Sequence, residues 1–287
     1  MENRCSGVEN PCLAVKKTVI KMEIVLMTSN IWADVFGNPV EGRDQALVTL
    51  IERYEPDVLM LQEVHPNWHR SAVLASGLDK NGYVISMPDL GSNTLNYTPL
   101  VFNSRRFREE KSLFRLFSGP NDYTSKSVSG AVLRETGSGK AFAAMSTHFY
   151  FAQNPDGNAA RLGNARELIE CFDSLCSEGI PGFCGGDFNC DISSEPFAVL
   201  NAAGIFCASA LAENRINFIR THHKNPEYDA ENCRYIPAKP SKKDNNLSID
   251  HIVLRGNGLA IKEYEVIADE EALILSDHCP VLIRAEI

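Results

Sequence analysis

Short apolar runs alternate with helical patterns from Lys21 to the C-terminal residue. The runs are rich in β-branched or aromatic residues and are flanked by turn residues, a pattern that predicts β-strands. The predicted strands are Glu23–Trp32, Asp57–Val64, Tyr83–Met87, Pro99–Asn103, Val128–Glu135, Ala141–Tyr150, Gly182–Phe188, Ile249–Arg255, Ala260–Ala268 and His278–Glu286.

Four segments have the spacing of amphipathic helices. They are Asp44–Glu55, His69–Leu78, Ala159–Cys176 and Glu195–Ala203. The third is the clearest, because Leu162, Ala165, Leu168 and Phe172 recur at helical spacing and charged residues lie between them. The first ends just before Pro56, which disfavours helical conformation in the residue that precedes it.

The continuous alternation of strands and helices predicts a single α/β domain over residues 21–287, preceded by a loose polar leader at residues 1–20. Some strands are joined by short turns, such as residues 136–140, so the sheets are expected to be mixed. One open sheet of this many strands would be unusual. Two stacked sheets flanked by helices are therefore the predicted architecture.

The composition and net charge of the chain limit the functions that it can have. Hydrophobic residues make up 44% and charged residues 23% of the chain, which is typical of a globular protein. The net charge of −9 argues against a general nucleic-acid coat protein, which would be basic. It is compatible with an enzyme acting on phosphates, because a bound divalent cation can supply positive charge.

The cysteines and the lengths of the apolar runs indicate the cellular location of the protein. The nine cysteines include no CxxC pair, which argues against a structural zinc site and favours reduced thiols. We find neither a signal-peptide core nor an apolar run of about 18 residues. The sequence therefore predicts a cytoplasmic protein without a membrane span, and it indicates no obligate protein partner.

Polar side chains of one chemical character follow the apolar strands. Because ligands bind α/β sheets at strand ends, we expect these side chains to converge. Carboxylate and amide oxygens suit a hard cation such as Mg²⁺, and histidines can bind phosphate or move protons. The residues are Asn30, Glu63, His148, Asp187, Asn189, Asp250, Asp277 and His278.

Each of these residues also has a purely structural explanation. Glu63 could be a solvated strand end, His148 a buried and hydrogen-bonded histidine, and Asp277 a turn cap. Asp187 and Asn189 in GGDFN are more specific, because the glycines allow close backbone approach and the i, i+2 spacing points both side chains the same way. The recurrence of one chemical character at six strand ends favours a common site.

Six motifs together resemble the endonuclease/exonuclease/phosphatase superfamily. They cover residues 22–287 in the order expected for that superfamily. The resemblance implies a four-layer α/β/β/α sandwich and Mg²⁺-dependent hydrolysis of phosphoester bonds, with Mn²⁺ as a substitute ion. The motifs are SNIW (29–32), LQEV (61–64), STH (146–148), GGDFN (185–189), SIDHI (248–252) and SDHCPV (276–281).

The superfamily leaves the substrate open. The first hypothesis is a phosphodiesterase or nuclease-like enzyme. The alternative is a phosphatase or phosphodiesterase of a small or lipid-linked phosphate. A catalytically inactive binding protein of the same fold is a third hypothesis, against which the complete set of site residues argues.

The resemblance also implies roles for individual residues. Glu63 corresponds to the direct metal ligand, Asp277 to the carboxylate that completes the metal site, and Asn30 to a residue beside the metal. The remaining roles are catalytic: Asp187 and Asn189 align and deprotonate the attacking water, Asp250 fixes His278, and His148 holds a phosphate oxygen.

Substrate contacts are predicted from two further features. Arg161 resembles a frequent arginine of the superfamily, although Asn164 replaces the usual glutamine three residues later. Residues 214–246 look irregular and contain seven Lys or Arg against four Asp or Glu, a net charge of +3 in an acidic chain. Long loops in compact domains are often functional. We therefore expect Arg220, Lys224 and Arg234 to contact the substrate away from the scissile phosphate.

Two other motifs are set aside on chemical grounds. TGSGKA (136–141) lacks the first glycine of a phosphate-binding loop and carries Ala141 where a hydroxyl should bind the metal, so it is interpreted as a hairpin turn. His222 and His223 are adjacent and would point apart on a strand, which argues against a zinc site.

Overall fold

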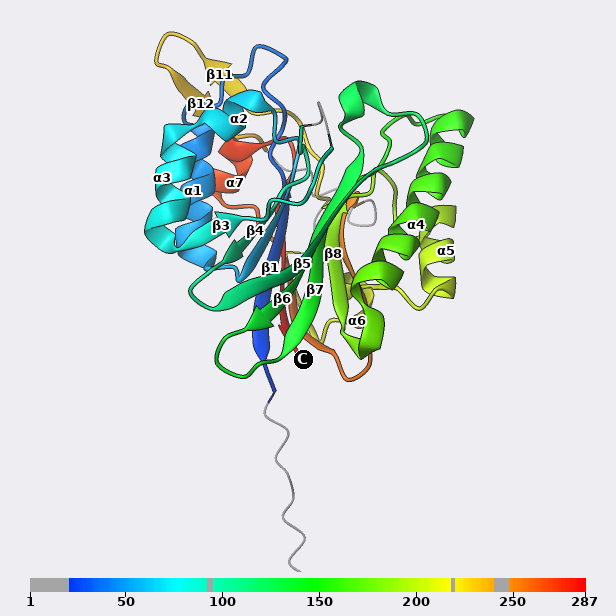
Figure 1. The fold of residues 1–287 in the computed structure, drawn as a ribbon. Helices are drawn as coiled ribbons and strands as arrows, with labels where there is room; N and C mark the ends of the chain where they lie inside the picture. The colour runs from blue at the N-terminus through cyan, green and yellow to red at the C-terminus, as the bar shows by residue number, and fades with distance from the viewer. Residues whose placement is uncertain (1–20, 92–94, 218–219, 240–247) are drawn as a thin grey trace, which may run out of the picture.

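The structure is a computed structural model, and it describes residues 21–91, 95–217, 220–239 and 248–287. Two mixed β-sheets stack face to face, and helices cover their outer faces (Figure 1). The predicted four-layer α/β/β/α architecture is confirmed. The leader predicted for residues 1–20 lies outside the described residues. Among the described helices, none has the length and apolar character needed to cross a membrane.

The first sheet has seven strands, and its two central strands, β1 and β2, are parallel. The neighbours of this pair, β15 and β4, run antiparallel to it. Its strands are, in order, β10 (Asn214–Ile216), β14 (Ala260–Val266), β15 (Val281–Glu286), β1 (Glu23–Asn30), β2 (Val58–Gln62), β4 (Leu100–Asn103) and β3 (Tyr83–Ile85).

The second sheet has six strands, of which only β7 and β8 pair in parallel. The turn at residues 136–140 joins β6 to β7 as an antiparallel hairpin, as predicted. Its strands are, in order, β5 (Phe107–Leu116), β6 (Ser127–Glu135), β7 (Ala141–His148), β8 (Gly182–Asp187), β13 (Asp250–Arg255) and β9 (Phe206–Cys207).

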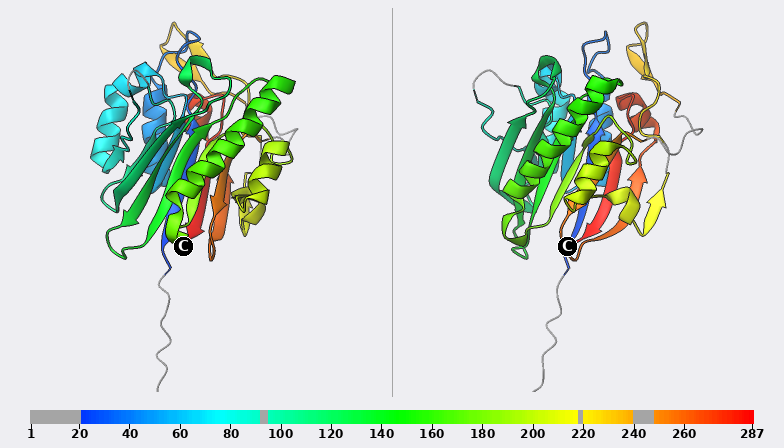
Figure 2. Two further views of the ribbon diagram at one scale, coloured as in Figure 1. Left: turned by 45° about the vertical axis from the view of Figure 1, so that its right-hand side comes forward. Right: turned by 90° about the vertical axis from the view of Figure 1, so that its right-hand side faces the viewer.

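Helices lie on both outer faces of the sandwich (Figure 2). The first sheet is covered by α1 (Arg43–Tyr54), α2 (Pro66–Arg70), α3 (Ala72–Asn81) and α7 (Glu270–Leu275), and the second by α4 (Pro155–Leu175) and α5 (Glu195–Ala202). A short helix, α6 (Ala208–Leu211), packs against β13 and β14. Asn154 caps α4, because its side chain accepts a hydrogen bond from the Gly157 N–H and Pro155 follows at the first helical position.

The main core lies between the sheets. Along β1, Leu26 points into this core and Met27 points outward to the helices, as the two-residue period of a strand requires. Phe183 and Ile252 face Leu26 from the second sheet and are fully buried. Each such side chain contributes roughly 1.5–3 kcal/mol through removal of apolar surface from water.

The structure divides one predicted helix and contains one long strand that was not predicted. The helix expected at residues 69–78 is divided into α2 and α3 at Ser71, whose hydroxyl caps α3 by accepting from the Leu74 N–H. The strand β5 was not predicted, because FREEKSLFRL lacks clear alternation. Its position at the sheet edge explains this sequence: one face is solvated, and charged residues on an edge discourage pairing with other chains.

Residues 214–246 are more regular than expected in the part that the structure describes. Residues 214–216 form β10, which pairs with β14. Glu227–Asp229 (β11) and Arg234–Ile236 (β12) form a separate antiparallel hairpin. The strand predicted to begin at His278 begins instead at Val281, so the polar residues before it lie in a loop.

Arg43, at the start of α1, has a buried guanidinium group that makes many hydrogen bonds. It is fully buried and donates five hydrogen bonds to backbone carbonyls of residues 31, 32, 38, 39 and 275. Its guanidinium also lies over the rings of Trp32, Trp68 and Tyr235. It therefore holds the loop after β1 against the end of α7.

We expect Arg43→Met to lower the free energy of unfolding by about 3 kcal/mol or more, because several buried carbonyls lose their donors. Urea denaturation measures the effect. Arg166→Met, on the exposed face of α4, is the matched control and should change stability by less than about 0.5 kcal/mol. If Arg43→Met and Arg166→Met were equally stable, the conclusion that Arg43 holds the loop after β1 against α7 would be contradicted.

Candidate active site

Strand register brings three predicted site residues into one row. His148 at the end of β7 is the register partner of Asp187 at the end of β8, and Asp187 is in turn the partner of Asp250 on β13. Side chains in register on neighbouring strands lie side by side. Residues that are widely separated in the sequence therefore meet at one edge of the second sheet.

Two residues reach this edge from the first sheet. Asn30 ends β1, and Glu63 directly follows β2. The Asn30 amide donates to Glu63 Oε1 and to Asp187 Oδ2, both at 3.2 Å. The Ala33 N–H donates to Glu63 Oε2 at 2.8 Å. Asn30 thus links the carboxylates of the two sheets and sets their separation.

Backbone strain accompanies this arrangement. Glu63 has φ of 60° and Asn189 has φ of 52°, both in the left-handed region. Asparagine tolerates this conformation, but a glutamate there costs about 1 kcal/mol or more. Such strain persists where the surrounding contacts hold it, and at Glu63 it turns the carboxylate away from the strand and into the site.

Asp187 accepts several hydrogen bonds at the centre of the site. The Asn189 N–H donates to Asp187 Oδ1 at 2.8 Å, and His148 Nε2 lies 3.4 Å from Oδ2. Burial opposes ionisation, but the hydrogen bond and charge of His148, with the charge of His278, hold the pKa of Asp187 well below its usual range. Asp187 is therefore a carboxylate at neutral pH.

Asp250 and His278 form a buried pair. His278 Nδ1 lies 2.8 Å from Asp250 Oδ2, which leaves Nε2 directed toward Asp187 at 4.0 Å. Burial alone would lower the pKa of His278, but the Asp250 carboxylate outweighs burial and raises the pKa well above its ordinary value. Asp250 therefore fixes the orientation of the ring and favours its charged form.

Glu63 is also held in its charged form. Burial would raise its pKa, but the positive charges of His148 and Lys126 outweigh burial, so the pKa of Glu63 is lowered. The carboxylate is thus available as an oxygen ligand at neutral pH.

These residues surround a cavity of about 820 Å³. Asn30 and Asp250 are buried behind its lining and act on it through the residues they contact. The predicted catalytic and metal-binding residues that line the cavity are Glu63, His148, Asp187, Asn189, Asp277 and His278.

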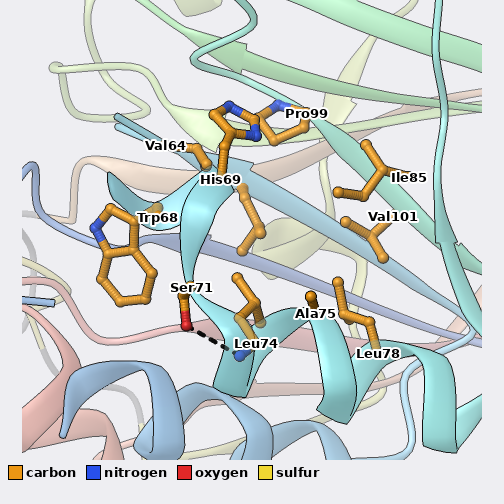
Figure 3. Close-up of a pocket in the computed structure, with 11 residues that line it drawn as sticks. Val64, Trp68, His69, Ser71, Leu74, Ala75, Leu78, Ile85, Pro99 and Val101 are labelled. Atoms are coloured by element: carbon orange, nitrogen blue, oxygen red, sulfur yellow. Dashed lines mark hydrogen bonds between the residues drawn. The ribbon is translucent and has the colours of Figure 1, made fainter. Parts of the chain in front are cut away.

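A second pocket is a poor candidate site. It encloses about 50 Å³ between α3 and the first sheet and is lined mainly by apolar side chains such as Leu74, Leu78 and Val101 (Figure 3). The Ser71 hydroxyl at its edge is engaged in capping α3. A space this small and apolar offers no chemistry and little room for a ligand.

The structure separates the predicted substrate-contacting residues. Arg220 lines the large cavity, whereas Lys224 and Arg234 are exposed and do not. Arg234 belongs to the β11–β12 hairpin and lies 3.7 Å from Asp229. Arg161 lines the cavity but is buried, and it donates to the carbonyls of residues 150 and 152. Arg161 therefore supports the loop that follows β7.

Lys126 and His222 line the cavity, although neither was predicted as a site residue. Lys126 precedes β6 and contacts His148, and only the β6–β7 pairing could have placed it there. His222 was set aside with His223. However, His222 lines the cavity, and its ring centroid lies 4.8 Å from that of His278. The backbone bridge between His222 and His278 explains this contact.

The donor atoms fit a divalent cation. Asp187, Asp250 and His278 form one group whose ligand atoms lie within 4.8 Å of one another, and His222, Asp277 and His278 form a second. Asp250 Oδ1 is buried and has no hydrogen-bond partner among the described residues. The carboxylate oxygens of these groups are of the kind that a hard cation prefers, whereas His278 in its charged form has no lone pair to offer a metal.

The glycines of GGDFN are required by close packing. A Cβ on Gly186 would lie 2.1 Å from the Thr147 backbone oxygen, and a Cβ on Gly185 would lie 2.7 Å from Met60 Cε. The prediction that these glycines permit close approach is confirmed. They allow β8 to pack directly beside β7 and beneath β2, which brings Asp187 to the site.

We expect Gly186→Ala to lower the free energy of unfolding by about 3 kcal/mol, because the clash is with backbone that cannot move aside. Thermal and urea unfolding measure the change. Gly163→Ala in α4, where a Cβ meets nothing within 4 Å, is the matched control and should stabilise the protein by roughly 0.5–1 kcal/mol. Stability of Gly186→Ala at or above wild type would refute the close-packing argument.

Comparison with known proteins assigns the family. A model described as the endonuclease/exonuclease/phosphatase family matches residues 27–278. The chain therefore belongs to this family, whose members are hydrolases acting on phosphoesters and are generally dependent on divalent metals. No curated protein matches the chain.

Solved structures share the fold at low sequence identity. An endonuclease/exonuclease/phosphatase family protein from Bacteroides thetaiotaomicron has a TM-score of 0.74 at 17% identity, over 93% of this chain and 99% of that chain. A mannosyl-6-phosphatase from the same species has a TM-score of 0.71 at 18% identity, over 91% and 99%. The human Nocturnin catalytic domain has a TM-score of 0.67 at 20% identity, over 92% and 94%.

Proposed function

We propose that this protein hydrolyses phosphoesters with the help of bound Mg²⁺, for which Mn²⁺ can substitute. The observation that carries this proposal is the convergence of Glu63, Asp187 and His278 from both sheets on one polar cavity. Carboxylates fixed in their charged form sit beside histidines that can donate hydrogen bonds. This combination suits a cation and a phosphate held together.

Glu63 and Asp277 would hold the metal, because both carboxylates line the cavity and neither is consumed by a strong salt bridge among the described residues. Asn30 would position Glu63 rather than face the cavity. When bound there, Mg²⁺ would polarise a phosphoryl oxygen and stabilise charge on the leaving oxygen.

Asp187 and Asn189 would act on the attacking water. The Asp187 carboxylate accepts the proton of the water while the new bond between oxygen and phosphorus forms. Its low pKa keeps it unprotonated at neutral pH. The hydrogen bond from the Asn189 N–H fixes its orientation.

His148 and His278 would bind the phosphate. Phosphoryl transfer develops charge on the phosphate oxygens, so donors placed beforehand lower the barrier. His278 is held charged by Asp250 and can donate through Nε2. The bond between phosphorus and the ester oxygen then breaks, and the departing oxygen takes up a proton from solvent.

The test is an activity panel with Mg²⁺, with Mn²⁺ and with excess chelator. It should include single-stranded and duplex DNA, an abasic site, RNA, inositol phosphates, sugar phosphates and sphingomyelin. We expect hydrolysis of at least one phosphoester, lost in chelator and restored by added Mg²⁺. Absence of hydrolysis across the panel, or activity that resists chelator, would refute the proposal.

A further inference from the structure

Lys126 brings a buried ammonium group to the cavity. Its side chain is 5% exposed, and Nζ lies 3.0 Å from His148 Nε2 and 3.4 Å from His148 Nδ1. Nζ therefore contacts both ring nitrogens instead of pointing along one lone pair. Burial of an ammonium group is costly unless an anion or several acceptors compensate it.

No carboxylate within hydrogen-bond distance compensates Lys126 among the residues that the structure describes. The nearest carboxylate oxygen, Asp122 Oδ1, lies 3.8 Å from Nζ, beyond hydrogen-bond distance; it is buried and accepts no hydrogen bond among the described residues. His148 is a weak acceptor for Lys126, because its Nε2 also faces Asp187 Oδ2 at 3.4 Å. A nitrogen that donates to Asp187 has no lone pair left for Lys126.

A second cationic side chain on the same cavity has one buried donor without an acceptor among the described residues. Arg220 lines the cavity, and its Nε is buried without a hydrogen-bond acceptor in the described part of the chain. The cavity walls also carry the aromatic rings of Trp32 and Phe151. Donors without acceptors, beside a proposed phosphate site, indicate that the missing acceptor is an anion of the substrate.

We propose that Lys126 is a specificity-determining residue that, together with His148, binds a terminal oxygen of a phosphomonoester. This inference rests on the proposed function and names its substrate class. A monoester has three terminal oxygens and nearly two negative charges, whereas a diester has two and one. Lys126 supplies the donor and the charge that only the monoester needs, and it makes or breaks no covalent bond.

The first test compares two esters with the same leaving group, p-nitrophenyl phosphate and bis(p-nitrophenyl) phosphate, in Mg²⁺. Lys126→Met should lower kcat/KM for the monoester at least about 30-fold and for the diester less than about 3-fold. Lys126→Arg keeps the charge and should retain monoester activity within about 10-fold of wild type. Equal losses for the two esters, or no loss, would overturn the inference.

Lys80→Met is the matched control, because Lys80 lies on α3, is 72% exposed and pairs with Glu52. It should leave both kcat/KM values unchanged. Circular dichroism and thermal melting verify that Lys126→Met folds. If Lys126→Met unfolds, Lys126→Arg and Lys126→Gln provide the comparison, and monoester selectivity should follow the charge.

The second test needs no catalysis. Calorimetry should detect binding of inorganic phosphate to the metal-free wild-type protein, weakened at least about 10-fold in Lys126→Met and unchanged in Lys80→Met. Absence of phosphate binding in wild type would overturn the role of Lys126. Phosphate binding through Lys126 without hydrolysis of any ester would instead refute the proposed function alone.

Two further substrates test whether the terminal phosphate belongs to a small molecule or to a nucleic acid. A sugar 6-phosphate tests a small molecule, and an oligonucleotide with a 5′-terminal phosphate tests a nucleic-acid end. Both molecules present the same terminal oxygens. If they are substrates, Lys126→Met should therefore hydrolyse both of them more slowly than wild type does. Preserved hydrolysis of every monoester by Lys126→Met would contradict the inference.

Discussion

Glu63→Gln is expected to lower kcat on the order of 10³-fold and to weaken Mg²⁺ binding, because the amide retains the size of the carboxylate and removes its charge. Glu63 accepts from the Asn30 amide at Oε1 and from the Ala33 N–H at Oε2, so glutamine keeps the size of the side chain but can accept only one of these two hydrogen bonds. Loss of activity would then report on the missing charge together with one lost hydrogen bond.

Two measurements check this result. Steady-state kinetics across a Mg²⁺ titration separates weaker metal binding from a lower maximal rate, and calorimetry measures Mg²⁺ binding without substrate. Glu52→Gln on α1 is the matched control, since Glu52 pairs with Lys80 at the surface. Full activity of Glu63→Gln in excess chelator would refute the hypothesis that catalysis requires a metal ion bound by Glu63.

The second large effect is expected at the Asp250–His278 pair. Asp250→Asn should lower kcat on the order of 10²-fold or more, because His278 loses the partner that fixes its ring and stabilises its charge. His278→Ala should cost at least as much. The double variant should lose little beyond His278→Ala, because the two residues act as a unit. Multiplied losses in the double variant would show that they act separately.

The pair also predicts a dependence on pH. The pKa of His278 in the folded protein is raised well above its ordinary value, mainly by Asp250 against the effect of burial. The stabilisation from this pair is therefore fully present below about pH 6.5, the unfolded value, and is lost as pH rises through the folded pKa. Asp250→Asn should remove this dependence and lower the pKa of His278.

Nuclear magnetic resonance titration of the histidines in metal-free protein measures the shift directly, and urea denaturation at several pH values measures its effect on stability. Asp173→Asn is the control, because Asp173 forms an exposed pair with Arg255. An unchanged His278 titration in Asp250→Asn would contradict the assignment of Asp250 as its charge partner.

The sequence contained enough local information to predict most of the elements that carry the site. Strand β8 and the residues after it were predicted from a continuous apolar run that ends in GGDFN, and the close packing of both glycines agrees with that prediction. The long helix α4 was predicted from its period, although its start moved to Pro155 because the cap at Asn154 has no periodic signal. The spacing of apolar residues along one segment shows which side chains face inward, and the spacing differs between helices and strands.

Local patterns could not determine where Ser71 interrupts a helix or that β5 forms an edge strand. Both outcomes depend on neighbouring elements: a cap gains its hydrogen bond only when the chain turns there, and a charged strand is stable only beside β6. The same limit applied to residues 214–246, where β10 needs β14 as a partner.

The chemistry of the site was determined partly by sequence and partly by tertiary structure. The sequence alone supplied carboxylates, amides and histidines at strand ends, and therefore the class of chemistry. Only the stacking of two sheets places the Asn30 amide between Glu63 and Asp187, and only the β6–β7 register brings Lys126 to His148. Register and sheet stacking depend on contacts between distant segments, whereas periodicity is a property of one segment. The substrate-facing charges therefore became visible only in the folded chain.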